Sequence, residues 1–126
     1  MSVSIKQLMA AANEAVPKIS ADEARKLVAK ENALIVDVRD GTEVDNTGKI
    51  KGAVHVSRGM IEFRADSSTP YHEPALRKDR TIVLYCASGG RSALAGKTLQ
   101  DMGYECVYNA GGMKELAEAG LETEPA

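Results

Sequence analysis

Cys86 is followed by a run of small, flexible residues that ends with a cation and a hydroxyl. The run consists of Ala87, Ser88, Gly89, Gly90, Arg91 and Ser92. The apolar residues 81–85 before it are typical of a buried strand, and residues 93–102 after it are typical of a helix. The thiol would then face backbone N–H groups and the positive end of a helix dipole, which stabilise a thiolate. We therefore expect the pKa of Cys86 to lie below the ordinary value for cysteine.

The other residues that could bind a metal or act as nucleophiles lack such surroundings. Cys106 falls in the middle of a predicted strand without a glycine loop or a cation nearby, which indicates a packing role. His55 lies in a predicted strand and His72 in a predicted loop, and neither has metal-ligand spacing to Cys86. The sequence therefore implies neither a metal nor an organic cofactor.

Length and composition indicate one ordinary globular domain. The chain has 126 residues, 44% of them hydrophobic, and a formal net charge of −2, which argues against a nucleic-acid binder that relies on bulk charge. No apolar run approaches the ~20 residues of a membrane helix, and the amino-terminal residues do not resemble a signal peptide. Two cysteines make no disulfide framework, so we expect a cytoplasmic protein with a free thiol.

Strands alternate with helices along the chain, a pattern that predicts a mostly parallel sheet with right-handed crossovers. We expect a single α/β domain with four to five strands and helices on both faces. Predicted helices cover residues 4–16, 20–30, 92–102 and 113–119, and predicted strands cover residues 33–38, 53–56, 81–85 and 104–108. The expected organisation is a helical extension at residues 1–18, the domain at residues 19–120 and a flexible tail at residues 121–126.

Three stretches in this order resemble the single-domain rhodanese family of sulfurtransferases. They are residues 35–39 with Glu43 and 48–53, residues 86–92, and residues 108–112. The resemblance implies a rhodanese-like domain that transfers sulfane sulfur from thiosulfate or a related small anionic donor. The thiophilic acceptor would be cyanide, a thiol or a protein thiol. Lys49 replaces a histidine that is usual in the family, and a frequent tryptophan near Leu116 is absent.

Sulfur transfer by this family implies that Cys86 cycles between a thiolate and a persulfide. Backbone N–H groups of residues 87–92 would stabilise the negative charge, because the glycines let the loop turn its amides inward. Ser88 and Ser92 can add hydroxyl donors. Arg91 can either bind an anionic donor or brace the loop from behind, since guanidinium geometry suits both roles.

Charged residues elsewhere give weaker candidates for the site. Asp37 could cap a turn or bond to the loop, and Arg39 could pair with Glu43 four residues later. Arg58 follows a strand that should end on the same side of the sheet as Cys86. With Arg64 it could form a cationic rim for anions, or both could simply be solvated.

Two other functions remain open at this point. Phosphatase and arsenate-reductase relatives have one more residue in the loop than the four between Cys86 and Arg91, so the spacing favours sulfur. A persulfide carrier that receives sulfur from a protein, with little turnover of small molecules, would use the same cysteine. The sequence leaves open the physiological donor and acceptor, the oligomeric state and the roles of residues 57–80 and of the first helix.

Overall fold

The computed structural model describes residues 2–126 and contains a central parallel sheet. Its four strands lie in the order β3, β1, β4, β5, so that β1 and β4 occupy the middle. The bounds are β1 Leu34–Asp37, β3 Val54–His55, β4 Ile82–Cys86 and β5 Val107–Gly112. The predicted α/β class and parallel sheet are thus confirmed.

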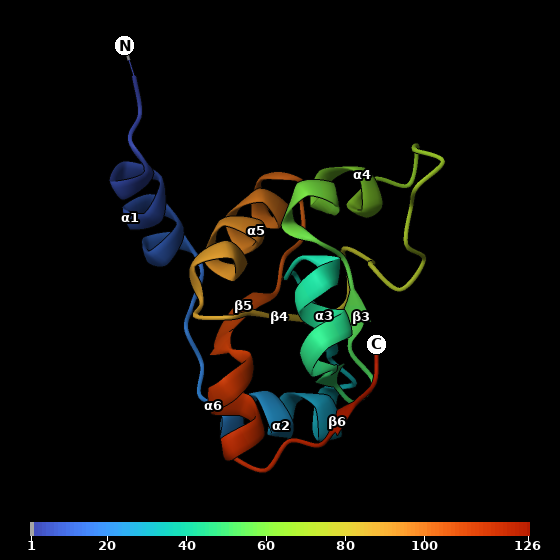
Figure 1. Cartoon of the computed structure of the whole chain (residues 1–126). Helices are drawn as coiled ribbons and strands as arrows, with labels where there is room; N and C mark the ends of the chain where they lie inside the picture. The colour runs from blue at the N-terminus through green and yellow to red at the C-terminus, as the bar shows by residue number, and fades with distance from the viewer. Residues whose placement is uncertain (1) are drawn as a thin grey trace.

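Helices cover both faces of this sheet, as Figure 1 shows. The face that carries α5 also carries α1 and α4, and the opposite face carries α2 and α6. Their bounds are α1 Ile5–Ala15, α2 Ala21–Glu31, α4 Ile61–Ala65, α5 Gly90–Asp101 and α6 Met113–Glu118. A short α3, Gly41–Thr47, and a 3-10 turn η1, Arg58–Met60, complete the helical elements.

Strand β4 is buried on both sides, which explains its uninterrupted apolar sequence. Ile82, Leu84 and Cys86 belong to the core beneath α5, whereas Val83 and Tyr85 belong to the core beneath α2 and α6. All five residues are at most 1% exposed. The two cores therefore hold the strand that carries the thiol from both faces.

Only the second half of α1 packs against the domain. The helix predicted at residues 4–16 is present, with Ala12 and Val16 buried, whereas Ile5 is 64% and Leu8 48% exposed. The helix lies against α5 (Figure 1), where a Cβ on Gly96 would meet a Val16 methyl at 2.9 Å. The missing side chain at Gly96 lets the two segments approach this closely.

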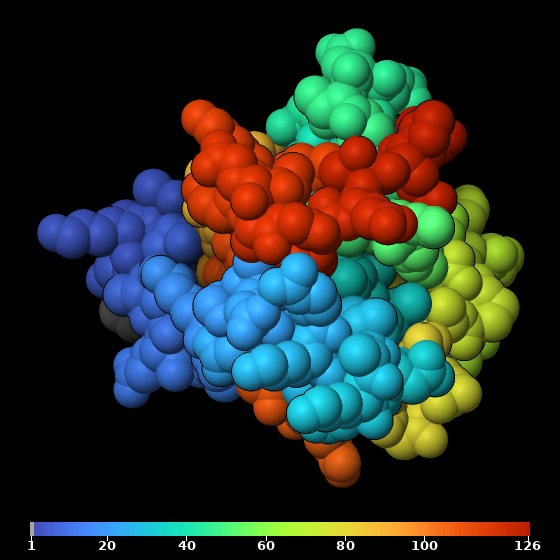
Figure 2. Space-filling view, turned by 90° about the horizontal axis from the view of Figure 1, so that it is seen from below, coloured from blue at the N-terminus to red at the C-terminus, as the bar shows by residue number. Residues whose placement is uncertain are grey.

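Residues 121–126 are not the free tail that the sequence suggested. Strand β6, Thr123–Glu124, pairs antiparallel with β2, Lys49–Ile50. The Lys49 ammonium forms an ion pair with the Glu124 carboxylate, so the residue that replaces the family histidine helps to hold this ribbon together. Figure 2 shows the end of the chain lying on the surface of the domain. A two-residue strand has too little pattern to be recognised in a sequence.

Two predicted boundaries near the site also shift. Helix α5 begins at Gly90, two residues before the predicted start at residue 92. Strand β5 begins at Val107 instead of residue 104, so Cys106 precedes the strand and does not lie in its middle. The chain turns at Gly103, whose φ of 101° suits glycine, and the Tyr104 side chain then enters the core beneath α5.

A glycine substitution tests whether β6 is bound in solution. A Cβ on Gly48 would lie 2.5 Å from the Glu124 carbonyl oxygen, whereas one on Gly52 would meet nothing within 4 Å, and both residues have positive φ. Gly48→Ala should lower the unfolding free energy by about 1–3 kcal/mol more than Gly52→Ala in urea titrations. When residues 121–126 are removed, the losses of unfolding free energy caused by Gly48→Ala and Gly52→Ala should become more similar, because Glu124 is no longer present. A difference that persists unchanged in the shortened chain would show that β6 does not cause it.

Candidate active site

The Cys86 sulfur lies at the carboxyl end of β4, in the turn that leads into α5. Cys86 is only 1% exposed and is a free cysteine. Its strand neighbour is Gly112 at the end of β5, after an irregularity in the pairing of the two strands. The end of a central parallel strand is where α/β sheets bind ligands, so the thiol occupies the expected position for a reactive group.

Donors from the loop surround this sulfur. The Gly89 N–H donates to Cys86 Sγ at 3.0 Å, and the Ser92 hydroxyl lies 3.5 Å from Sγ. Burial raises the pKa of the Cys86 thiol, but hydrogen bonds from the Ser92 hydroxyl and from the Ser92, Ser88 and Gly89 amides outweigh it. The net effect is a lowered pKa, because donors aimed at sulfur favour the charged form. The loop therefore favours a reactive thiolate.

Asn109 on β5 is a buried polar residue that the sequence analysis missed. It is 2% exposed, and its amide group contacts three parts of the site. Its Nδ2 donates to the Gly89 carbonyl at 3.0 Å, and its Oδ1 accepts from the Gly111 N–H at 2.9 Å. The loop is thus fixed to β5 at Gly89. The residue stands between two recognised motif positions, but the sequence alone gives no sign that its side chain turns toward the loop.

The contacts of Asn109 determine where the Ser92 proton lies. A backbone N–H can only donate and a carbonyl can only accept, so the Gly111 and Gly89 partners fix the orientation of the Asn109 amide. The Ser92 hydroxyl, 2.7 Å from Oδ1, must then be the donor to Asn109. A hydroxyl has one proton. Ser92 therefore donates to Asn109 while sulfur is protonated, and it must rotate toward Sγ to stabilise the thiolate.

Arg91 is held by a carboxylate. Its two terminal nitrogens donate to the two carboxylate oxygens of Glu43 at 2.6 and 3.0 Å, and Asp40 lies 4.0 Å away. The Arg91 guanidinium lowers the pKa of Glu43 to about 2, and Glu43 in turn raises the pKa of Arg91. Of the two roles left open for Arg91, this geometry supports the brace, because the charge is already paired.

Asp37 and Arg39 form a separate buried pair. The Arg39 guanidinium donates to both oxygens of Asp37, with the shortest distance 2.7 Å, and also to the Gly48 carbonyl at 2.6 Å. The expected pairing of Arg39 with Glu43 is wrong, because Glu43 instead faces Arg91. Asp37 accepts the Arg39 N–H at 2.9 Å, so it does close a turn. The pair joins the end of β1 to the end of α3.

Arg58 and Arg64 have partners of their own. The Arg58 guanidinium donates to Glu62 at 3.1 Å and to the Thr98 hydroxyl at 3.3 Å. Thr98 is eight residues into α5, about 12 Å along the helix from its start. Arg64 donates to Glu73 at 3.1 Å. The structure thus does not bring either guanidinium to the Cys86 loop by direct contact.

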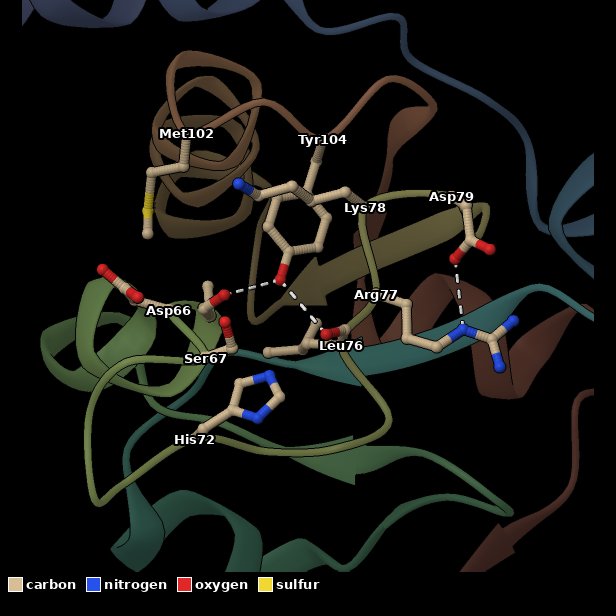
Figure 3. A pocket seen from close by; sticks show the side chains of 10 residues that line it. Asp66, Ser67, His72, Leu76, Arg77, Lys78, Asp79, Met102 and Tyr104 are labelled. Carbon is tan, nitrogen blue, oxygen red and sulfur yellow. Dashed lines mark hydrogen bonds and ion pairs between the residues drawn. The ribbon is translucent and has the colours of Figure 1, made fainter.

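A cavity of about 600 Å³ lies beyond the end of α5 that is distant from the Cys86 loop (Figure 3). Its lining includes Met102 and Tyr104, which follow a helix about 18 Å long that begins at the loop. The Tyr104 hydroxyl donates to the Ala65 carbonyl at 2.8 Å, which fixes the irregular segment before β4. His72 lines this cavity. Among residues 2–126, no three His, Cys, Asp or Glu side chains gather to hold a metal ion.

The Ser92 hydroxyl gives one test of this arrangement. Ser92→Ala should raise the pKa of Cys86, because the thiolate loses a donor, and should slow alkylation by iodoacetamide at pH 7 about tenfold. The rate is measured from pH 4 to 10 in a Cys106→Ser background. Ser92→Thr, which keeps the hydroxyl, is the matched control. A profile unchanged by Ser92→Ala would contradict a thiolate-stabilising role for this hydroxyl.

The Arg91–Glu43 pair gives a second test, on stability. The pKa of Glu43 is lowered from 4.5 in the unfolded chain to about 2 in the folded protein. The pair therefore stabilises the fold fully at pH values above 4.5, and this stabilisation is lost as the pH falls toward 2. Glu43 is 37% exposed, so solvent reduces the effect to about 1 kcal/mol. Glu43→Gln should therefore destabilise the protein in urea titrations at pH 7, by an amount that shrinks between pH 4.5 and 2. An equal difference at all pH values would contradict the ionic origin.

Comparison with known proteins places this site in a family. The rhodanese-like domain family matches residues 20–119. Of the relatives, the Bacillus subtilis protein "Putative sulfurtransferase YtwF" is 37% identical over 100 residues, covering 79% of this chain and 85% of its own length. An Allochromatium vinosum sulfurtransferase is 34% identical over 98 residues, covering 77% and 83%. The match to the B. subtilis "Putative sulfur carrier protein YrkF" spans only 46% of that protein's length.

A solved structure resembles nearly the whole chain. A Rhodopseudomonas palustris protein of unknown function, described as a possible tyrosine phosphatase, superposes with a TM-score of 0.87 at 37% identity. The match covers 98% of this chain and 96% of that one, so it includes the first helix. None of the helices within residues 2–126 has the length and apolarity needed to cross a membrane. On the match over residues 20–119 and on these relatives, the chain belongs to the rhodanese-like family of sulfurtransferases.

Proposed function

We propose that the protein transfers sulfane sulfur through a persulfide on Cys86, with thiosulfate or a related small anion as donor. The observation that carries the proposal is the set of donors around a buried sulfur, with the Gly89 N–H at 3.0 Å from Cys86 Sγ. Such donors stabilise an anion without reacting with it. The sulfurtransferase relatives support transfer of sulfur in general.

The proposed reaction has two balanced steps. The Cys86 thiolate attacks the sulfane sulfur of thiosulfate, a new sulfur–sulfur bond forms, and the old one breaks as sulfite leaves with the electron pair. A thiolate or cyanide acceptor then attacks the outer sulfur and releases the Cys86 thiolate. The loop amides and Ser92 would hold the negative charge in the thiolate and the persulfide alike. Arg91, fixed by Glu43, would keep the loop in shape during both steps.

A phosphatase is the second candidate, favoured by the description of the R. palustris structure. Hydrolysis of a phosphate ester uses a general acid to protonate the leaving group. Glu43 contacts the loop through Arg91, but with a pKa of about 2 it is ionised at neutral pH and carries no proton to donate. The Gly89 N–H also donates its hydrogen bond directly to Cys86 Sγ. These contacts favour sulfur over a tetrahedral phosphate.

The decisive experiment is intact mass spectrometry of the reduced protein after incubation with thiosulfate. Wild type and Cys106→Ser should gain one sulfur atom, Cys86→Ser should gain none, and cyanide should remove the added sulfur. No gain on a protein whose Cys86 is shown to be free would contradict the proposal for thiosulfate. Hydrolysis of p-nitrophenyl phosphate that is abolished in Cys86→Ser would then support the phosphatase. Fast loading from a protein persulfide donor, with slow thiosulfate turnover, would indicate a carrier.

A further inference from the structure

The site needs a cation other than Arg91 if it is to select an anionic substrate. The Arg91 charge is neutralised by two hydrogen bonds to Glu43. Arg58 is likewise paired, with Glu62. An anion that approaches Cys86 therefore finds hydrogen-bond donors at the loop, but neither of these guanidinium groups is free to attract it.

A cavity of about 340 Å³ adjoins the loop and is walled on one side by α1. Gly89, whose N–H contacts the Cys86 sulfur, lines this cavity together with Ser88. Helix α1 contributes Met9 and Asn13 to the lining. The volume lies within the range of about 300–1,000 Å³ that is typical of sites for organic small molecules. An inorganic anion such as thiosulfate would leave most of this space empty.

Lys18 is the one charged residue among those that line this cavity. Its backbone is fixed against the sheet by a parallel bridge to Asn109. Asn109 donates its N–H to the Pro17 carbonyl at 2.9 Å and accepts the Ile19 N–H at 3.0 Å. Lys18 makes no ion pair with any residue in the 2–126 range. The fixed backbone therefore places an exposed lysine side chain at this cavity, without a carboxylate partner to neutralise its charge.

We infer that this cavity, formed by α1, Lys18 and the loop, binds an organic thiol that carries a carboxylate and acts as the sulfur acceptor. The Lys18 ammonium would attract the carboxylate, Met9 and Ile19 would contact the apolar arm, and the thiol would reach the outer sulfur over Gly89. The inference rests on the proposed function. The cavity wall from α1 lies outside residues 20–119, which match the family, so acceptor choice would depend on an element added to the common domain.

The test compares two acceptors of similar size, glutathione and its diethyl ester, which lacks free carboxylates. Protein loaded with sulfur by thiosulfate is mixed with each thiol, and the rate of sulfur loss is followed by mass spectrometry over a range of thiol concentrations. Lys18→Gln should raise the half-saturating concentration of glutathione about fivefold and leave that of the ester within twofold, since one exposed charge pair is worth about 1 kcal/mol. Added salt should weaken the preference of wild type for glutathione.

Lys114→Gln is the matched control, because Lys114 is 84% exposed on α6 and does not line the cavity. Lys114→Gln should change the half-saturating concentration of neither glutathione nor its diethyl ester. Equal effects of Lys18→Gln on both thiols, no effect on either, or loaded protein that transfers sulfur to neither thiol would overturn the inference while leaving the proposed function intact. Wild-type protein that forms no persulfide with thiosulfate would overturn both.

Discussion

The structure depends on one electrostatic compensation, which is the stabilisation of a charge on a sulfur atom that is almost completely buried. Burial alone disfavours a thiolate, and Cys86 is only 1% exposed. The Gly89 N–H and the Ser92 hydroxyl supply the opposing effect at 3.0 and 3.5 Å. The Gly89 N–H already points at the sulfur, and the Ser92 hydroxyl has only to rotate its proton from Asn109 toward Sγ when charge develops. The rest of the domain can be understood as the framework that holds them in place.

Two side chains from other elements, Glu43 and Asn109, fix the loop. On one side Arg91 reaches Glu43 of α3, and on the other the Asn109 side chain of β5 binds the Gly89 carbonyl and the Ser92 hydroxyl. One of these groups comes from α3, which follows β1, and the other from β5, and β1 and β5 are the two strands that flank β4. The loop amides keep their direction because these contacts tie Gly89 and the start of α5 to neighbouring elements. Rigid support of this kind is what a preorganised site requires.

Much of the fold and the central cysteine could be predicted because their signals are local. The buried run before Cys86 and the glycines after it are contiguous, and the helix predicted at residues 20–30 is present as α2, Ala21–Glu31. The partner choices were harder. Arg39 was expected to pair with Glu43, four residues later, but Glu43 binds Arg91, 48 residues away in the sequence. The role of Asn109 likewise depends on β5 lying beside β4. Such contacts, like the β2–β6 ribbon, are set by tertiary packing and leave no periodic pattern in the sequence.

The most direct test of the account is the ionisation of Cys86 itself. Thiolate absorbance near 240 nm can be titrated in the folded Cys106→Ser protein and, at the same pH values, in the protein unfolded by urea. If the loop donors outweigh burial, Cys86 ionises at a lower pH in the folded protein than in the unfolded one. A folded-state pKa equal to or above that of the unfolded chain would contradict the claim that this loop is built to hold a charged sulfur.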